Sequence, residues 1–120
     1  MDRRPALGKH AEQLATLHLE RLGYRVLARN WRRPEGELDI VVERDGVCVF
    51  VEVRSRTGID RGHPVETVDA RKRARVRRAA LLYLQEEAST AEVFRFDVVG
   101  VTFAADDGPP EIVHIEDAFC

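Results

Sequence analysis

Residues 37–55, ELDIVVERDGVCVFVEVRS, hold two runs rich in valine and isoleucine on either side of Asp45 and Gly46. Such runs are typical of β-strands, and Asp-Gly between two of them is a strong signal for a two-residue hairpin turn. With this turn, Arg44 faces Val47, and the pairing of the remaining residues follows. We therefore predict an antiparallel hairpin whose register assigns every side chain to one of its two sides.

One side of this hairpin is wholly aliphatic. It consists of three facing pairs: Leu38 with Val53, Ile40 with Val51, and Val42 with Val49. A loop with an odd number of residues would mix the two sides, because successive side chains of a strand point in opposite directions. We expect the aliphatic side to face the core. On the other side the facing pairs are Glu37 with Arg54, Asp39 with Glu52, and Val41 with Phe50.

The pair of Asp39 and Glu52 is the unusual feature of the second side. Facing residues of a hairpin have Cβ atoms roughly 5 Å apart, and like charges at that distance are destabilising. A shared proton, a nearby cation or a bound divalent metal can offset the repulsion. Two carboxylates with backbone carbonyls close by are suitable oxygen ligands for Mg²⁺. The alternative is a solvent-facing sheet surface that carries mixed charges.

Two further charged residues are expected near this pair. Arg54 follows Glu52 by two residues and so lies on the same side of the strand, roughly 6–7 Å away. Residues 6–22 have the apolar spacing of an amphipathic helix, and Glu12 borders its apolar stripe. Glu12 is therefore either a third acid that faces the hairpin or an ordinary residue at the edge of the helix.

The rest of the chain predicts a single α/β domain over residues 1–120, with a mixed central sheet flanked by helices. Residues 24–32 are expected to be extended, residues 65–87 helical, and residues 92–103 and 111–116 strands. The composition, 44% hydrophobic and 33% charged, is that of a soluble globular protein. Cys48 and Cys120 lack partners at a metal-binding spacing, so we expect free thiols and a cytoplasmic location.

The charge of the chain is strongly asymmetric. The net charge is −2, yet residues 1–84 carry an excess of six positive charges and residues 85–120 an excess of eight negative charges. The positive charge is densest in residues 70–78, ARKRARVRR. Such a helix attracts phosphate backbones, or it is simply a solvated surface. The candidates for nucleic-acid contacts are Arg71, Lys72, Arg75 and Arg78.

Two polar residues near the end of the chain are expected to be structural. Asp97 lies within a run of buried character, RFDVV, and pairing with Arg95 or with a backbone group is the simplest role for it. His114 has no partner four residues away or across the expected hairpins, so we interpret it as non-catalytic.

Five segments together resemble the YraN family of small bacterial proteins: GKHAE (8–12), GELDIV (36–41), VFVEVRSR (49–56), RFDVV (95–99) and HIEDAF (114–119). The strand pair is also similar to the PD-(D/E)xK nuclease superfamily, which has the restriction-endonuclease-like fold and includes Holliday junction resolvases. The signature of that superfamily is an acid at the start of one strand and D/E-x-K on its neighbour. In this chain Asp39 supplies the first acid, and Glu52 begins the second element as EVR.

The resemblance implies a metal-dependent nuclease with Mg²⁺ or Mn²⁺ as cofactor and a nucleic acid, expected to be DNA, as partner. Asp39 and Glu52 would hold the metal together with the backbone carbonyl of Val53, and Glu12 would be the acid on the helix. Arg54 stands where the superfamily has lysine. Arginine can stabilise phosphate charge but does not lose its proton, so it cannot be a general base. Metal-bound water would then supply the nucleophile.

Two other functions remain open from the sequence. The first is a catalytically silent nucleic-acid-binding module, since Arg54 replaces the expected lysine. The second is a protein–protein adaptor that uses the acidic last third of the chain. A junction-cutting enzyme would need two active sites, so a homodimer is one expected state.

Overall fold

The computed structural model describes residues 4–57, 68–87, 89–104, 106 and 108–119. In chain order its elements are α1 (Arg4–Arg21), β1 (Arg25–Arg33), β2 (Gly36–Arg44), β3 (Val47–Thr57), α2 (Ala70–Glu86), β4 (Val93–Phe103) and β5 (Glu111–Phe119). The strands form one sheet in the order β1-β2-β3-β4-β5. Only β3 and β4 pair in parallel within this sheet, and α2 lies between them in the chain.

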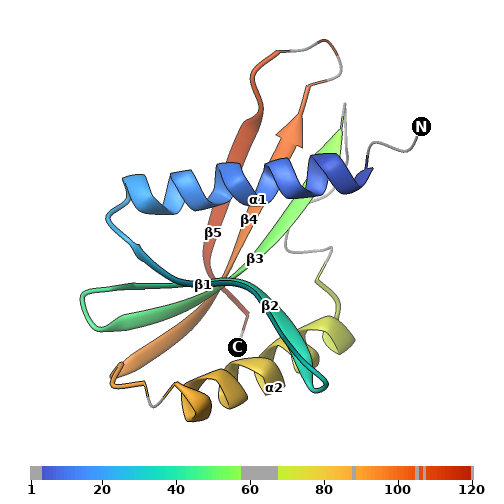
Figure 1. Cartoon of the computed structure of the whole chain (residues 1–120). Helices are drawn as coiled ribbons and strands as arrows, with labels where there is room; N and C mark the ends of the chain where they lie inside the picture. Colours follow the sequence, from blue (N-terminus) through green and yellow to red (C-terminus); the bar gives the residue numbers. More distant parts are fainter. Residues whose placement is uncertain (1–3, 58–67, 88, 105, 107, 120) are drawn as a thin grey trace.

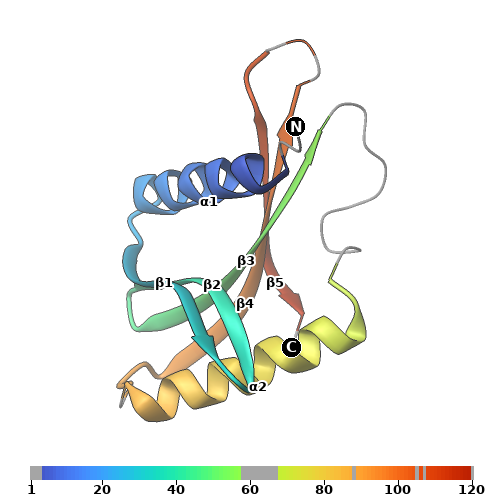
Figure 2. The same ribbon diagram turned by 45° about the vertical axis from the view of Figure 1, so that its right-hand side comes forward.

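The two helices lie on opposite faces of the sheet (Figures 1 and 2). A mixed sheet flanked by helices was predicted, and the structure confirms this architecture. Each face of the sheet has its own buried cluster. The cluster under α1 contains Ala11, Ala15, Leu19, Tyr24, Ile40, Val42, Val49, Val51, Val99 and Val101. The cluster under α2 contains Leu38, Val41, Cys48, Phe50, Val68, Val76, Ala79, Ala80, Tyr83, Phe96, Val98 and Phe119.

The turn of the predicted hairpin is confirmed. Asp45 and Gly46 both have positive φ, at 52° and 79°, as a type I′ hairpin turn requires. The ladder between β2 and β3 then runs in the predicted register from Arg44 opposite Val47 to Ile40 opposite Val51.

The alternative of a solvent-facing second side is excluded, because α2 covers that side and Val41 and Phe50 are fully buried there. One expectation about the hairpin was wrong: Leu38 belongs to the α2 cluster and not to the side of Ile40. At this point the strands diverge: the β2–β3 ladder ends at Ile40, whereas β2 continues to pair with β1, so the hairpin register no longer determines where Leu38 lies.

The divergence also removes a predicted ion pair. Glu37 was expected opposite Arg54, but in the structure its carboxylate lies 3.2 Å from Nε of Arg32 on β1. β2 therefore follows β1 away from β3 over its first residues. The two strands form a fork, and the predicted acids lie at the point where the fork opens.

Helix α2 begins later than the sequence pattern indicated. Residues 65–67 of the predicted helix lie outside the described part, and Val68 and Asp69 precede the first helical residue. Asp69 is the N-cap: its Oδ1 accepts a hydrogen bond of 2.9 Å from the backbone N–H of Lys72. This cap fixes where the first turn of α2 lies over the sheet.

Gly36 allows β2 to pass closely beneath α2. A Cβ atom built on Gly36 would lie 2.7 Å from the backbone oxygen of Arg75, and a backbone atom cannot move aside as a side chain can.

We expect Gly36→Ala to lower the free energy of unfolding by about 1–3 kcal/mol, the usual range for overpacking. Urea titration would measure it. Gly8→Ala is the matched control, since nothing lies within 4 Å of that position; equal losses in both variants would contradict the close approach.

Candidate active site

Glu52 lies in the middle of β3 and is fully buried. Both of its carboxylate oxygens are inaccessible and lack a well-formed hydrogen bond within the described part of the chain, although the backbone N–H of Asp39 is near enough to oppose weakly the rise of the Glu52 pKa. A carboxylate in such a place carries a large desolvation penalty unless another group compensates for it. Burial, and to a smaller extent the charge of Asp39, raises the pKa of Glu52 to about 8. The sheet therefore holds an acid that is poised to lose its proton near neutral pH.

Asp39 lies across the fork from Glu52. Its Oδ2 accepts a hydrogen bond of 2.9 Å from the backbone N–H of Val53, so the side chain spans the gap that the ladder leaves open. Burial raises the pKa of Asp39, while the Val53 hydrogen bond and the charge of Lys72 oppose that rise. The two acids predicted to face each other thus interact in the structure, although the ladder ends one pair before them.

The structure brings Glu12 to the same place from α1. Oε2 of Glu12 accepts a hydrogen bond of 3.2 Å from the side-chain amide of Asn30 on β1. Asn30 has a φ of 51°, a conformation that asparagine tolerates better than most residues. The charge of Glu12 contributes to the raised pKa of Asp39. Glu12 is thus close enough for its charge to act on Asp39, and Asn30 is the residue holding Glu12 that the sequence did not single out.

Two cations act on the pair. Arg54 lies on the strand of Glu52, and its charge favours the ionised form of both acids. Its Nε is buried without a hydrogen-bond partner among the described residues. Lys72 reaches the site from α2, with Nζ 3.5 Å from Oε1 of Glu52. Sequence reasoning assigned Lys72 to an outer phosphate-binding surface and could not foresee this inward position.

The other cations predicted for α2 lie on its outer side. The side chains of Arg71, Arg75 and Arg78 are exposed, whereas Val76, Ala79, Ala80 and Tyr83 are buried against the sheet. The exposed arginines therefore form a basic surface on the helix that covers Glu52. The structure leaves them free of the core, as phosphate contacts would require.

The acid pair fits a divalent cation, although it is not a complete ligand set by itself. Among the described residues no group of three or more His, Cys, Asp or Glu could hold a metal. Mg²⁺, however, usually retains several waters and uses only one or two carboxylates. The buried carboxylate of Glu52 beside that of Asp39 matches that demand. The contact of Val53 that the structure shows is made by its N–H, so a role for its carbonyl stays a prediction.

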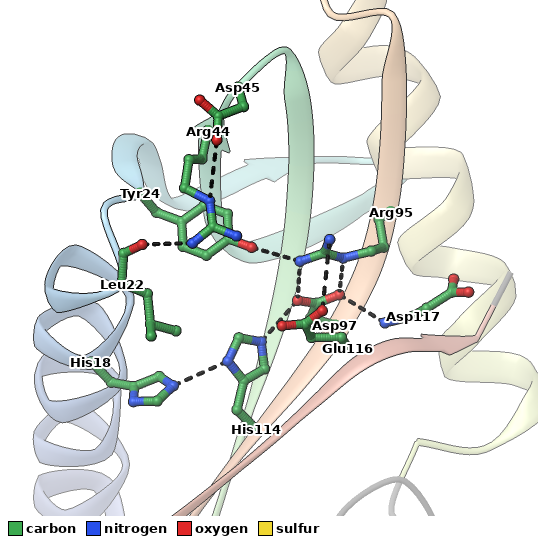
Figure 3. Close-up of polar contacts among 10 residues, drawn as sticks. All are labelled: His18, Leu22, Tyr24, Arg44, Asp45, Arg95, Asp97, His114, Glu116 and Asp117. Carbon is green, nitrogen blue, oxygen red and sulfur yellow. Dashed lines mark hydrogen bonds and ion pairs between the residues drawn. The ribbon is translucent and has the colours of Figure 1, made fainter.

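A separate polar network surrounds Asp97 (Figure 3). Asp97 is fully buried, and Arg95 donates to both of its oxygens at 2.8 and 3.0 Å, which confirms the predicted pairing. His114 Nε2 lies 2.8 Å from Oδ2 of Asp97, and the backbone N–H of Asp117 donates to Oδ1 at 3.0 Å. Burial alone would raise the pKa of Asp97, but these hydrogen bonds together hold it below its usual value.

The network continues to α1 and to the start of β1. His18 Nε2 lies 3.0 Å from His114 Nδ1, and Arg95 donates to the hydroxyl of Tyr24 at 2.7 Å. The sequence offered His114 no partner four residues away or across an expected hairpin, and the structure gives it two, His18 and Asp97. Since the partners are up to 96 residues apart in sequence, no local spacing could have revealed them. The network ties α1 to β4 and β5, and none of the hydrogen bonds made by its members among the described residues reaches Asp39 or Glu52, so we interpret it as structural.

The fold and the site define a class of small α/β proteins in which two acids lie at a fork in a mixed sheet beneath a basic helix. Residues 11–101 match the profile of the family described as "Uncharacterised protein family UPF0102". The chain belongs to this family. The matched span contains Glu12, Asp39, Glu52, Arg54 and the whole of α2. This match confirms the family membership that the five sequence segments predicted.

Relatives from distant bacteria align along nearly the full chain. A UPF0102 protein of Acidothermus cellulolyticus is 44% identical over 127 residues, which cover 97% of this chain and 95% of the relative. One from Pelotomaculum thermopropionicum is 42% identical over 118 residues, or 98% of each chain. One from Pseudomonas aeruginosa is 45% identical over 113 residues, or 93% of this chain and 90% of the relative. None of the helices within the described ranges is long and apolar enough to cross a membrane.

Proposed function

We propose that the protein is a metal-dependent nuclease with a restriction-endonuclease-like fold of the PD-(D/E)xK type, which hydrolyses phosphodiester bonds in nucleic acid, with DNA as the expected substrate. The observation that carries this proposal is Glu52. Glu52 is a fully buried carboxylate beside a second acid, and within the described part of the chain its oxygens lack a well-formed hydrogen bond, so its ionised form destabilises the metal-free fold. Such an arrangement is typical of a site that is built to bind a cation.

Each residue of the site has a role in this proposal. Asp39 and Glu52 hold Mg²⁺ or Mn²⁺, which when bound supplies Lewis acidity and a nucleophilic water. Water attacks phosphorus and releases a proton to solvent, the bond from phosphorus to the ester oxygen breaks, and the leaving oxygen is protonated from solvent, so the negative charge on the phosphate oxygens increases in the transition state. Arg54, fixed beside Glu52, stabilises that charge and takes no proton. Glu12 adds negative charge next to Asp39, which favours cation binding.

A cleavage assay tests the proposal. DNA and RNA in single-stranded, duplex, nicked and branched forms would be incubated with the protein and Mn²⁺. We expect cleavage of at least one form, with a loss of 100-fold or more in Asp39→Asn. Arg54→Lys is expected to retain activity, because lysine keeps the positive charge beside Glu52. Binding without cleavage in every form would support the silent module, and neither binding nor cleavage would support the adaptor.

The exposed arginines of α2 predict a salt-dependent affinity for nucleic acid. Each phosphate contact contributes about 0.9 to the slope of log affinity against log salt concentration for duplex DNA. Replacing Arg71, Arg75 and Arg78 by glutamine should therefore reduce the slope by about 2–3, as measured by fluorescence anisotropy from 50 to 200 mM salt. The matched control replaces three exposed arginines of β1: Arg25, Arg29 and Arg32. Equal effects of the two triple variants would rule out α2 as the binding surface.

A further inference from the structure

Lys72 differs from the other cations of α2 in where its charge lies. It is in the first turn of the helix, and the hydrogen bond from its backbone N–H to Asp69 fixes its position. Its ammonium lies 3.5 Å from Oε1 of Glu52, and its side chain is 26% exposed, compared with 1% for that of Glu52. The lysine therefore connects the buried acid with solvent.

Lys72 is the main positive charge that compensates the acid pair in the absence of metal. Among the cations that lower the pKa of Glu52, Lys72 acts most strongly and Arg54 less so, and the same order holds for Asp39. Lys72 nevertheless makes an ion pair with Glu52 and no well-formed hydrogen bond, since neither Glu52 oxygen has one among the described residues. The ammonium is thus close to the carboxylate without being locked to it.

A divalent cation and the ammonium of Lys72 would compete for the same carboxylate. A metal bound to Glu52 would lie about 2.1 Å from a carboxylate oxygen and would become the largest local charge. It would repel an ammonium that stays beside that oxygen. Lysine has a flexible four-carbon stem, and this one is partly exposed already, so it can swing outwards, whereas Glu52 in the middle of a paired strand cannot.

We propose that Lys72 is the resident counter-cation of the Asp39–Glu52 pair and that binding of a divalent cation displaces its ammonium into solvent, next to the exposed arginines of α2. This inference rests on the proposed metal site. It also reconciles the inward position of Lys72 with the phosphate-binding role expected from sequence, because the displaced ammonium becomes available for a phosphate only after the metal has bound. Metal binding and substrate binding are thereby coupled through one side chain.

The composition of the chain makes displacement directly measurable. Lys72 and Lys9 are the only lysines in the sequence, and Lys9 is exposed on α1. Brief acetylation with an N-hydroxysuccinimide ester, followed by mass spectrometry, reports the accessibility of each ammonium separately. The experiment uses the full chain without nucleic acid, with and without Mg²⁺, and a parallel thermal melt establishes whether Mg²⁺ binds.

We expect Mg²⁺ to raise the acetylation rate of Lys72 at least threefold and to leave that of Lys9 unchanged. In Glu52→Gln, Lys72 should react quickly without Mg²⁺ and show no response to it, because the partner of the ammonium has been neutralised. If Mg²⁺ raises the melting temperature but leaves the Lys72 rate unchanged or lower, the displacement is refuted while the metal site stands. If Mg²⁺ changes neither quantity, both the displacement and the metal site are refuted.

Discussion

Glu52→Gln is expected to stabilise the metal-free protein by about 3 kcal/mol at pH 8.5 while it abolishes metal-dependent cleavage. The reason is the raised pKa of Glu52, which is about 8 in the fold against the usual 4.5. One pKa unit corresponds to about 1.4 kcal/mol, and the expected gain is smaller than the full shift because the amide of glutamine is itself a polar group that costs free energy to bury. Glutamine has nearly the same shape and carries no charge at any pH.

The sign of the effect follows from proton linkage. Because the folded-state pKa of Glu52 is above the unfolded one, the fold favours the protonated acid, and stability falls as pH rises from about 4.5 to about 8. The advantage of glutamine should therefore be small at pH 4.5 and greatest above pH 8. Urea unfolding at both pH values measures it, with Glu37→Gln as a control on the neighbouring strand. A variant less stable than the parent at pH 8.5 would show that the carboxylate is well paired in the fold.

Asp97→Asn is expected to have the opposite effect and to lower the free energy of unfolding by about 3 kcal/mol at pH 7. Removing one partner of a buried ion pair leaves the other charge uncompensated, at a cost of about 3–5 kcal/mol. The amide of asparagine keeps the shape of the carboxylate but sets N–H groups against Arg95 or His114. For a chain of this length the loss corresponds to a fall in melting temperature of about 10 °C.

The pH dependence distinguishes charge from shape at Asp97. Its pKa in the fold is lowered, so the stability it contributes is present above its unfolded pKa and is lost as pH falls through the folded one. The loss of unfolding free energy in Asp97→Asn should therefore persist from pH 8 to pH 5 and become smaller only in strong acid. Glu116→Gln is the matched control, because Glu116 is mostly exposed and lies 4.0 Å from Arg95. A deficit of similar size in that control would mean that the buried position of Asp97 has no special importance.

The hairpin shows how far sequence reasoning reaches. Asp45-Gly46 determines a local turn, and the turn determines the register of the next five residue pairs, so both could be predicted. Where the ladder stops depends on β1, which draws Leu38 and Glu37 away from β3. That competition between two neighbouring strands has no local signal, and the fork that positions Asp39 was therefore not foreseen.

Some residues of the candidate site could likewise be predicted from the sequence, and others could not. The strand spacing was enough to select Asp39, Glu52 and Arg54. Like charges that face each other across a ladder are destabilising unless a cation or a shared proton compensates them. The direction of Lys72 depends on how α2 is rotated about its axis over the sheet, which Asp69 and the close contact at Gly36 decide. The links of Asp97 to His114 and of His114 to His18 join distant parts of the chain and emerge only when the sheet is complete.

Calorimetric titration with Mn²⁺ at pH 8 shows whether Asp39 and Glu52 jointly hold a divalent cation. The parent should bind Mn²⁺ saturably, and binding should be lost in Asp39→Asn and in Glu52→Gln. Asp97→Asn, provided that it is folded at the temperature used, should bind like the parent, because Asp97 makes its contacts with Arg95, His114 and Asp117 and not with the acid pair. No saturable binding to the parent, or unchanged binding in Asp39→Asn, would contradict the account.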